Sequence, residues 1–143
     1  MAITAKKKNF KCSILTIGKN MIKSMNINRI DVPISSGLIS IYKDHAPYIS
    51  DIHFGKLMIY DENNNVINMY IEDGIVEVSK NTVSVLVKKA YYFDDLDLEE
   101  IKSKLETVSS QTFTAIEDIH RRDRNIHRLN FQLKLAEEIK NNL

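Results

Sequence analysis

Hydrophobic and polar positions alternate along short stretches in the first part of the chain. Within residues 10–17, Phe10, Cys12 and Ile14 fall on one side of an extended backbone, and the valines of residues 82–88 repeat this spacing. A period of two residues is typical of a β-strand with one buried face. Further strands are predicted in four short runs rich in β-branched and aromatic residues, namely residues 37–42, 56–60, 66–71 and 75–78.

Residue types that form turns separate these runs. Residues 61–65, 72–74 and 79–81 are rich in Asn, Asp and Gly, which tolerate the left-handed backbone of tight turns. Both prolines and all four glycines of the chain also precede residue 90. Because the predicted strands are closely spaced and no helix separates them, they favour an antiparallel β-sandwich or barrel.

After residue 90 the apolar residues recur every three or four positions, which is typical of helices. Asp97 and Glu100 have the spacing of a capping box, so a helix is predicted to begin there. A longer second helix is predicted from about residue 113, and along it Ile119, Ile126 and Leu133 repeat every seven residues, as in a coiled-coil seam.

The predicted fold class is therefore α+β, with an N-terminal antiparallel β-sandwich in residues 1–90 and a C-terminal two-helix antiparallel hairpin in residues 91–143. At about 30 residues, the second helix would span roughly 45 Å. Part of its apolar stripe then extends beyond the shorter first helix, which indicates a further protein partner.

The charges of the chain nearly cancel, because 20 Lys and Arg residues stand against 19 Asp and Glu residues among 143 positions. Residues 1–90 hold 12 basic and 8 acidic residues, whereas residues 91–143 hold 8 basic and 11 acidic residues. The whole chain therefore gives no electrostatic case for binding nucleic acid or an acidic membrane. A membrane-spanning helix needs about 20 mostly apolar residues, and the chain has no such stretch, so no direct membrane insertion is expected.

The densest positive charge lies in the predicted second helix, at Arg121, Arg122, Arg124 and Arg128. These side chains would either form salt bridges on a solvated helix face or contact an anion or an acidic protein, and both interpretations remain open. Aromatic residues suitable for base stacking do not interleave with the arginines, so no nucleic-acid partner is expected.

Few residues carry catalytic or metal-binding chemistry. Cys12 is the single cysteine, so it cannot form an internal disulfide, and it is predicted to be a core side chain. The basic N-terminus is not followed by the apolar stretch of a secretory signal. Together these features favour a reducing compartment. Asp44, His45, Asp51 and His53 are of types that bind zinc, which makes a small metal-dependent hydrolase an alternative function. No further ligands stand at a familiar spacing, so no metal is expected.

Four motifs follow one another along the chain: Gly37-Leu-Ile-Ser-Ile-Tyr-Lys-Asp-His45-Ala46-Pro47, Gly55 within residues 52–57, Gly74-Ile-Val-Glu-Val78, and Val83-Ser-Val-Leu86. Their order and spacing resemble the epsilon-subunit family of F-type ATP synthases, called delta in mitochondria. The resemblance covers nearly the whole chain and implies a non-catalytic subunit. It also implies an interface formed by six residues, Gly37, Ile41, His45, Ala46, Pro47 and Gly55.

The resemblance further implies partners and a location. The sandwich would contact the gamma subunit and the membrane rotor ring, help to couple ion movement to rotation, and lie peripherally on the cytoplasmic side of the cell membrane or in the equivalent organelle compartment. The hairpin would contact the catalytic alpha and beta subunits conditionally and inhibit hydrolysis. Its regulatory helix would use four arginines and an apolar stripe, namely Arg121, Arg122, Arg124, Arg128, Ile119, Ile126 and Leu133.

Several positions depart from the family pattern. Ser40 and Asp73 stand where a glycine is usual, Lys43 stands in place of a proline, and Asp44 in place of a glycine or asparagine. These changes leave open a diverged paralogue in a related rotary ATPase. A helical adaptor with a β-sandwich base, unrelated to rotary motors, is a further alternative.

Some bacterial members of the family bind ATP through an (Ile/Leu)-Asp-x-x-Arg-Ala motif at the first helix. Here Leu96 and Asp97 match the motif, but Glu100 replaces the arginine. A carboxylate in place of a phosphate-binding cation reverses the local charge. The resemblance therefore implies weak or absent ATP binding, and no cofactor is expected.

Overall fold

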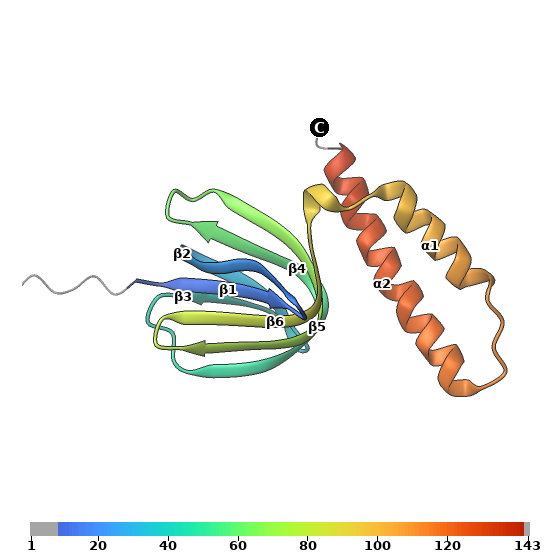
Figure 1. Ribbon diagram of the computed structural model, residues 1–143, viewed down its shortest axis with the longest axis horizontal. Coiled ribbons are helices and arrows are strands. Elements are labelled where there is room, and N and C mark those ends of the chain that lie inside the picture. Colours follow the sequence, from blue (N-terminus) through green and yellow to red (C-terminus); the bar gives the residue numbers. More distant parts are fainter. Residues whose placement is uncertain (1–8, 142–143) are drawn as a thin grey trace, which may run out of the picture. The chain divides into compact units, whose positions relative to one another are not determined.

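The structure is a computed structural model, and it describes residues 9–141 (Figure 1). Six strands precede a short 3-10 helix and two α-helices, in the order β1 (Lys11–Thr16), β2 (Lys19–Ile34), β3 (Gly37–Tyr42), β4 (Tyr48–Asp61), β5 (Val66–Ser79), β6 (Thr82–Tyr92), η1 (Phe93–Asp95), α1 (Leu98–Ser110) and α2 (Ile116–Asn141). The chain divides into two compact units between Ala90 and Tyr91. Within the described residues, no helix is both long and apolar enough to cross a membrane.

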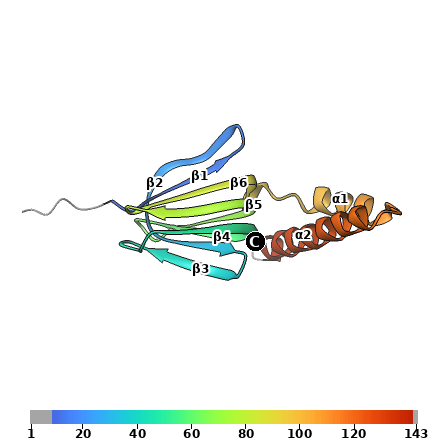
Figure 2. The same cartoon turned by 90° about the horizontal axis from the view of Figure 1, so that it is seen from below.

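The strands of the first unit form a closed ring. Their order is β1-β6-β5-β4-β2-β3, and β1 also pairs with β2, so the ring closes through β1 while β3 flanks β2 (Figure 1, Figure 2). The predicted β-sandwich followed by a helical hairpin is confirmed. One pair, β1 with β6, runs parallel rather than antiparallel. A ring of five strands requires this, because alternating directions cannot close on an odd number.

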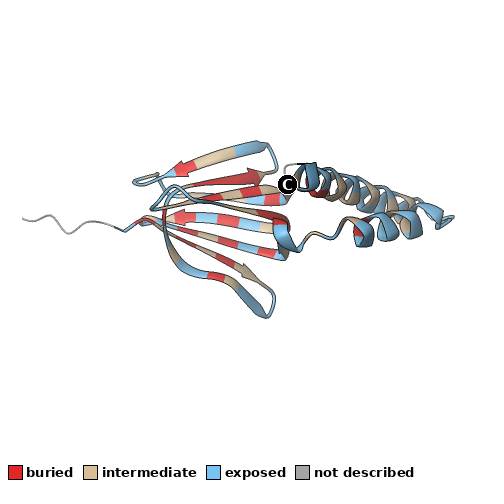
Figure 3. Cartoon of the chain, turned by 90° about the horizontal axis from the view of Figure 1, so that it is seen from above, coloured by how far each residue is buried: buried red, intermediate tan, exposed pale blue. Residues whose placement is uncertain are grey.

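The core of the ring comes from alternating side chains, visible in Figure 3 as buried positions between exposed ones along the strands. Cys12 and Ile14 of β1 are fully buried, as predicted, and so are Val83 and Val85 of β6, with Val87 2% exposed. In the parallel register, Cys12 lies beside Val83 and Ile14 beside Val85. The period-two pattern therefore identified the side chains that lie side by side on neighbouring strands, inside the ring.

The longest strand, β2, was not predicted. Its 16 residues lack a regular alternation, because irregularities interrupt the pairing with β1 near Ser24 and the pairing with β4 between Ile27 and Arg29. Ser24 adopts a left-handed backbone with φ of 55°, and its N–H donates to Ser13 Oγ at 3.1 Å. Such a bulge changes which side chains face the core, and four consecutive residues from Ile30 to Pro33 are buried. A strand with such irregularities shows no regular alternation of apolar and polar residues in its sequence.

The predicted turn at residues 72–74 is wrong, because β5 continues through it as a single strand. The register with β4 is unbroken, with Phe54 paired to Glu72 and Ile52 paired to Gly74. Asp73 lies within the strand with φ of 58°. A Cβ added to Gly74 would collide with the Leu86 carbonyl oxygen and lie 2.7 Å from Val87 Cα. Gly74 thus allows β5 and β6 to approach closely rather than forming a turn.

The other two predicted turns are confirmed. Between β4 and β5, Asp61 Oδ1 accepts the N–H groups of Asn63 at 2.8 Å and Asn65 at 2.9 Å. Between β5 and β6, Lys80 and Asn81 are both left-handed, with φ of 49° and 60°. Two successive left-handed residues form the tight turn whose twist matches antiparallel strands.

In the second unit, α1 begins as predicted, but only half of the capping box forms. Asp97 Oδ1 accepts the N–H groups of Glu99 at 3.0 Å and Glu100 at 3.3 Å. The Glu100 carboxylate instead lies 3.0 Å from Lys104 Nζ, one turn further along the helix. The N-cap therefore depends on Asp97.

The second helix, α2, begins three residues later than predicted and is twice the length of α1, with 26 residues against 13. At 1.5 Å per residue, these lengths correspond to about 39 Å and about 20 Å. The predicted stripe of Ile119, Ile126 and Leu133 is half-buried, whereas the buried residues of α2 are Leu135 and Ala136.

Replacing Gly74 with Ala tests the close approach of β5 and β6. The added methyl group meets backbone atoms of β6 that cannot rotate away, so we expect a loss of about 3 kcal/mol in the free energy of unfolding, measured in urea. Gly18→Ala is the control, because it adds only the cost of a left-handed backbone, about 1 kcal/mol, in open space. Equal losses in the two variants would contradict the role assigned to Gly74.

Candidate functional site

Apolar side chains lie exposed on the outer face of the sandwich. Val76 and Val78 of β5 point into the core. Because side chains alternate along a strand, Ile75 and Glu77 point outward. Cross-strand partners share a face, which places Ile49 of β4, paired with Glu77, on the same outer side. Ile49 is 66% exposed and Ile75 is 42% exposed.

The same face continues onto β6 and β1. Leu86, 48% exposed, points away from the core because its neighbours Val85 and Val87 are buried. The two-residue turn between β5 and β6 aligns Leu86 with Ile75, and the parallel register places Leu15 of β1 beside Leu86. We call Ile49, Ile75 and Leu86 the outer apolar patch.

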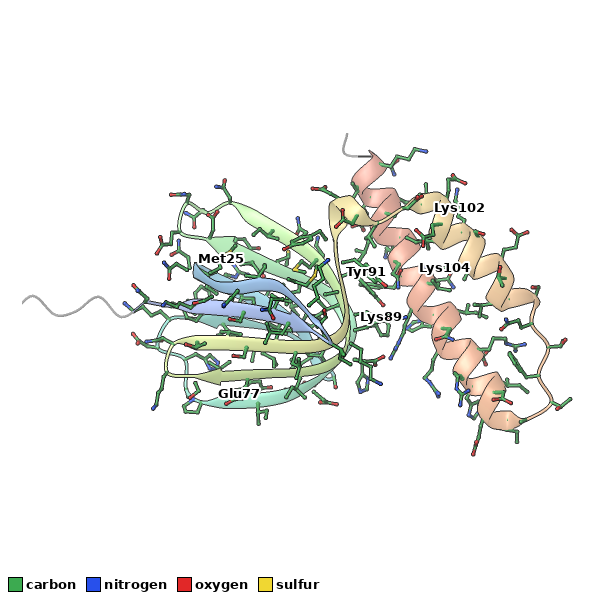
Figure 4. The ribbon with its side chains drawn as sticks, viewed as in Figure 1. Met25, Glu77, Lys89, Tyr91, Lys102 and Lys104 are labelled. Atoms are coloured by element: carbon green, nitrogen blue, oxygen red, sulfur yellow. The ribbon has the colours of Figure 1, made fainter. Side chains whose placement is uncertain are left out.

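A groove lies at one end of this face. Its volume is about 340 Å³, and it is lined by the start of β4 and the end of β5, at Pro47, Tyr48, Ile49, Glu77, Val78 and Ser79. The outward position of Glu77 on β5 is visible in Figure 4. The groove is therefore continuous with the outer apolar patch, since they share Ile49.

The loop before β4 is held by local contacts. The Nδ1 atom of His45 lies 2.7 Å from the Ala46 carbonyl oxygen, and the His45 ring meets the Tyr48 ring edge-on at 6.0 Å between centroids. Asp44 adopts a left-handed backbone with φ of 63°, and its N–H donates to Asn81 Oδ1 at 2.6 Å. His45 therefore contacts its own loop, at Ala46, and the first residue of β4, Tyr48.

The six predicted interface residues divide into two groups. Ala46 and Pro47 are exposed, His45 is half-buried, and Gly37 is exposed at the far end of β3 from this loop. The other two, Ile41 and Gly55, are buried in the sandwich. Ile41 is fully buried in the core, and a Cβ on Gly55 would lie 2.5 Å from Pro33 Cβ, so both shape the sheet from inside.

The residues considered for metal binding do not form one cluster. Asp51 and His53 pair on β4 with 3.4 Å between Oδ2 and Nε2, whereas Asp44 and His45 belong to the preceding loop. The pKa of the Asp51 carboxyl is lowered, mainly by the Ser35 hydroxyl and less by the nearby His53. Among residues 9–141, no group of three or more His, Cys, Asp and Glu side chains is arranged to hold a metal ion.

Cys12 is confirmed as a core side chain. It is fully buried, and burial raises the pKa of its thiol to about 12. Since the thiolate is the nucleophilic form, this thiol is unreactive at neutral pH.

The arginines of α2 differ in their contacts. Arg122 donates to the Gln111 carbonyl oxygen at 3.0 Å, so it connects the end of α1 to α2. Arg121 forms a longer pair with Asp118 at 3.7 Å, and Arg124 is exposed. Arg128 is half-buried. The four arginines therefore do not present one uniform charged surface.

A further cluster on the sandwich was not predicted. Arg29 of β2 binds the Asp31 carboxylate through two hydrogen bonds of 2.8 Å and 3.0 Å, and Asp31 is 1% exposed. The guanidinium carbon of Arg29 lies 4.8 Å from the Tyr60 ring centroid and 5.6 Å from that of Tyr42. This pair neutralises the buried carboxylate and joins β2 to β3 and β4, so its role is structural.

The described residues form a closed β-sandwich followed by a helical hairpin, with apolar side chains exposed on the outer face of the sandwich. Residues 9–92 match the family described as ATP synthase, Delta/Epsilon chain, beta-sandwich domain. The chain is 32% identical to the ATP synthase epsilon chain of Pelagibacter ubique over 67% of this chain and 73% of that protein. It is 28% identical to the epsilon chain of Staphylococcus aureus over 87% of this chain and 93% of that protein.

The fold comparison covers the helices as well. A chain in the structure of the Tetrahymena thermophila mitochondrial ATP synthase, central stalk and c-ring, superimposes with a TM-score of 0.69 at 16% identity, over 92% of this chain and 99% of that chain. The chain belongs to the ATP synthase delta/epsilon family. It is accordingly a subunit of a larger ATPase assembly rather than an enzyme in its own right.

Proposed function

We propose that this chain is a central-stalk subunit of an F-type rotary ATPase, which turns with the gamma subunit and couples ion flow to ATP synthesis or hydrolysis. The observation that carries the proposal is the outer apolar patch beside the His45 loop, in a chain of this family. Contiguous exposed apolar side chains mark surfaces that bind other proteins.

We assign the outer apolar patch to the gamma subunit. Ile49, Ile75 and Leu86 lie on three adjacent strands of a hydrogen-bonded sheet, so they form a preorganised surface that loses little entropy on binding. Burial of such side chains contributes about 25 cal/mol per Å² of apolar area. The exposed Ala46 and Pro47 extend the surface beyond the strands.

The membrane rotor ring is assigned to a different part of the sandwich. Gly37 begins β3 at the opposite end from the His45 loop, and the adjacent Leu38 is 59% exposed. A turn at this end contacts the ring while the outer apolar patch remains available to gamma. In this arrangement the chain is peripheral to the membrane, on the cytoplasmic side of a cell membrane or its organelle equivalent.

Ile49→Asp tests the proposed gamma-binding face. A carboxylate buried within an apolar interface must lose its hydration, so we expect the affinity of the chain for the gamma-containing complex to fall at least about tenfold. Val66→Asp, at the far end of β5 and 44% exposed, is the matched control and leaves the affinity unchanged. Unchanged binding by Ile49→Asp, with the variant folded by circular dichroism, would refute this assignment.

The helical hairpin is assigned a regulatory role, in which α2 contacts the catalytic alpha and beta subunits and inhibits hydrolysis. Arg122 is already bound to the Gln111 carbonyl oxygen, so in the folded hairpin it is less available than Arg121 and Arg124. Guanidinium groups on exposed helix positions suit acidic segments of a partner. Ile119, Ile126 and Leu133 supply apolar contacts alongside them.

Replacing both Arg121 and Arg124 with Ala should relieve inhibition. Each exposed ion pair contributes up to about 1 kcal/mol, so ATP hydrolysis by the assembled complex is expected to rise severalfold. Lys134→Ala with Lys140→Ala removes the same charge from exposed positions of the same helix and should have no effect. Deletion of residues 113–143 sets the upper limit, and a complex whose hydrolysis is unaffected by this deletion has no such regulation.

We also propose that the chain binds ATP weakly or not at all, and uses no cofactor. Asp97 is occupied by the helix cap, and Glu100 places a carboxylate where the motif requires a cation. Isothermal titration of the chain should give a dissociation constant above about 1 mM, while Glu100→Arg, which restores the cation, should bind more tightly. Tight, magnesium-independent binding by the unaltered chain would overturn this expectation.

A further inference from the structure

Two residues near the groove have an unusual backbone conformation for side chains that carry a Cβ. Asp44, in the loop before β4, has φ of 63°, and Asn81, in the turn before β6, has φ of 60°. Left-handed conformations are unfavourable for most residues, although Asp and Asn tolerate them when their short side chains form local hydrogen bonds. At these two positions the hydrogen bonds are not local in sequence.

Asp44 and Asn81 bind each other through two bonds across 37 residues. The Asp44 N–H donates to Asn81 Oδ1 at 2.6 Å, and Asn81 Nδ2 donates to Asp44 Oδ1 at 3.2 Å. The backbone of Asn81 takes part as well, because its carbonyl oxygen accepts the N–H of Lys11 at 3.0 Å. Asn81 therefore connects three segments, which are the start of β1, the His45 loop and the β5–β6 turn.

These bonds lie at the end of the groove. One wall of the groove is Pro47–Ile49, which follows Asp44 by a few residues, and the other wall is Glu77–Ser79, which precedes Asn81. The walls themselves are paired strands, with Tyr48 opposite Val78. The Asp44–Asn81 pair lies beyond this pairing and joins the loop that precedes the β4 wall to the turn that follows the β5 wall, so it limits how far the loop can move from the turn.

We propose that Asn81 is a positioning residue, which fixes the His45–Pro47 loop against the β5–β6 turn and so sets the shape of the surface that receives a partner protein. This deepens the proposed function, since it rests on the gamma subunit docking at the outer apolar patch and the adjoining groove. Asn81 itself need not touch the partner. It acts through the backbone of Asp44.

Asn81→Gly removes both side-chain bonds and keeps a residue that adopts φ of 60° without strain. Lys80→Gly is the matched control, because Lys80 occupies the same turn with φ of 49° and gains the same backbone freedom. Loss of the bonds should accelerate hydrogen exchange of the Asp44 amide about tenfold in Asn81→Gly. The exchange rate should not change in Lys80→Gly.

Charge provides a second, independent comparison. Asn81→Asp keeps the oxygen that accepts the Asp44 N–H but replaces the Nδ2 donor of the 3.2 Å bond with a carboxylate oxygen. Repulsion between this carboxylate and that of Asp44 should separate the loop from the turn and so accelerate Asp44 exchange, as Asn81→Gly does. Combining Asn81→Asp with Asp44→Asn exchanges the two side chains and restores one donor and one acceptor. This double variant should recover slow exchange, which a purely conformational role for Asn81 does not predict.

Binding to the gamma-containing complex then separates this proposal from the function on which it rests. We expect Asn81→Gly to weaken binding about threefold to tenfold, Lys80→Gly to have no effect, and the exchanged pair to restore binding. Unaltered Asp44 exchange in Asn81→Gly would overturn the link between the loop and the β5–β6 turn. Faster exchange with unaltered binding, while Ile49→Asp abolishes binding, would overturn the positioning role alone. Normal binding by Ile49→Asp would instead contradict the proposal that gamma docks at the outer apolar patch.

Discussion

The sandwich depends on the double pairing of β1, which bonds to β2 on one side and to β6 on the other. This pairing joins the beginning and the end of the unit, and Lys11 is further held by the carbonyl oxygen of Asn81. Without β1, β2 and β6 would each expose an unpaired edge, the feature that promotes aggregation of β-proteins. Closure also buries Cys12 and Ile14 against the valines of β6.

The same closure produces the candidate binding face. Because β1 and β6 pair in parallel, Leu15 lies beside Leu86, and the outward side of four neighbouring strands becomes one continuous surface. The surface is rigid where it is made of strands, and in the loop before β4 it depends on the two hydrogen bonds between Asp44 and Asn81, one of which has a backbone donor. The helical hairpin differs: α2 is longer than α1, Arg121 and Arg124 are exposed, and Arg122 donates to the Gln111 carbonyl oxygen. A preformed strand surface and a separate helical unit are consistent with the proposed docking to gamma and the proposed regulatory role of the hairpin.

Sequence patterns predicted those parts of the fold that depend on neighbouring residues. Alternation identified the buried faces of β1 and β6, and the chemistry of Asp61 and Asp97 predicted a turn and a helix start. The pattern failed where contacts between distant residues decide the structure. The bulge at Ser24 hides the alternation of β2, and Gly74 resembles a turn residue although its role is close packing against β6. Likewise, a family motif does not distinguish the buried Ile41 from the exposed Pro47, and nothing in the sequence indicated that Asp44 meets Asn81.

If the outer face of the sandwich carries the chain on the gamma subunit, as we propose, then Ile75 lies against gamma in the assembled complex, because it is in the middle of the outer apolar patch. A photo-cross-linking amino acid at position 75, introduced into the chain within the native assembled complex, shows which subunit it meets. Mass spectrometry of the irradiated complex should find the chain joined to gamma. Cross-links only to the membrane ring or to the catalytic subunits would show that this face binds a different partner.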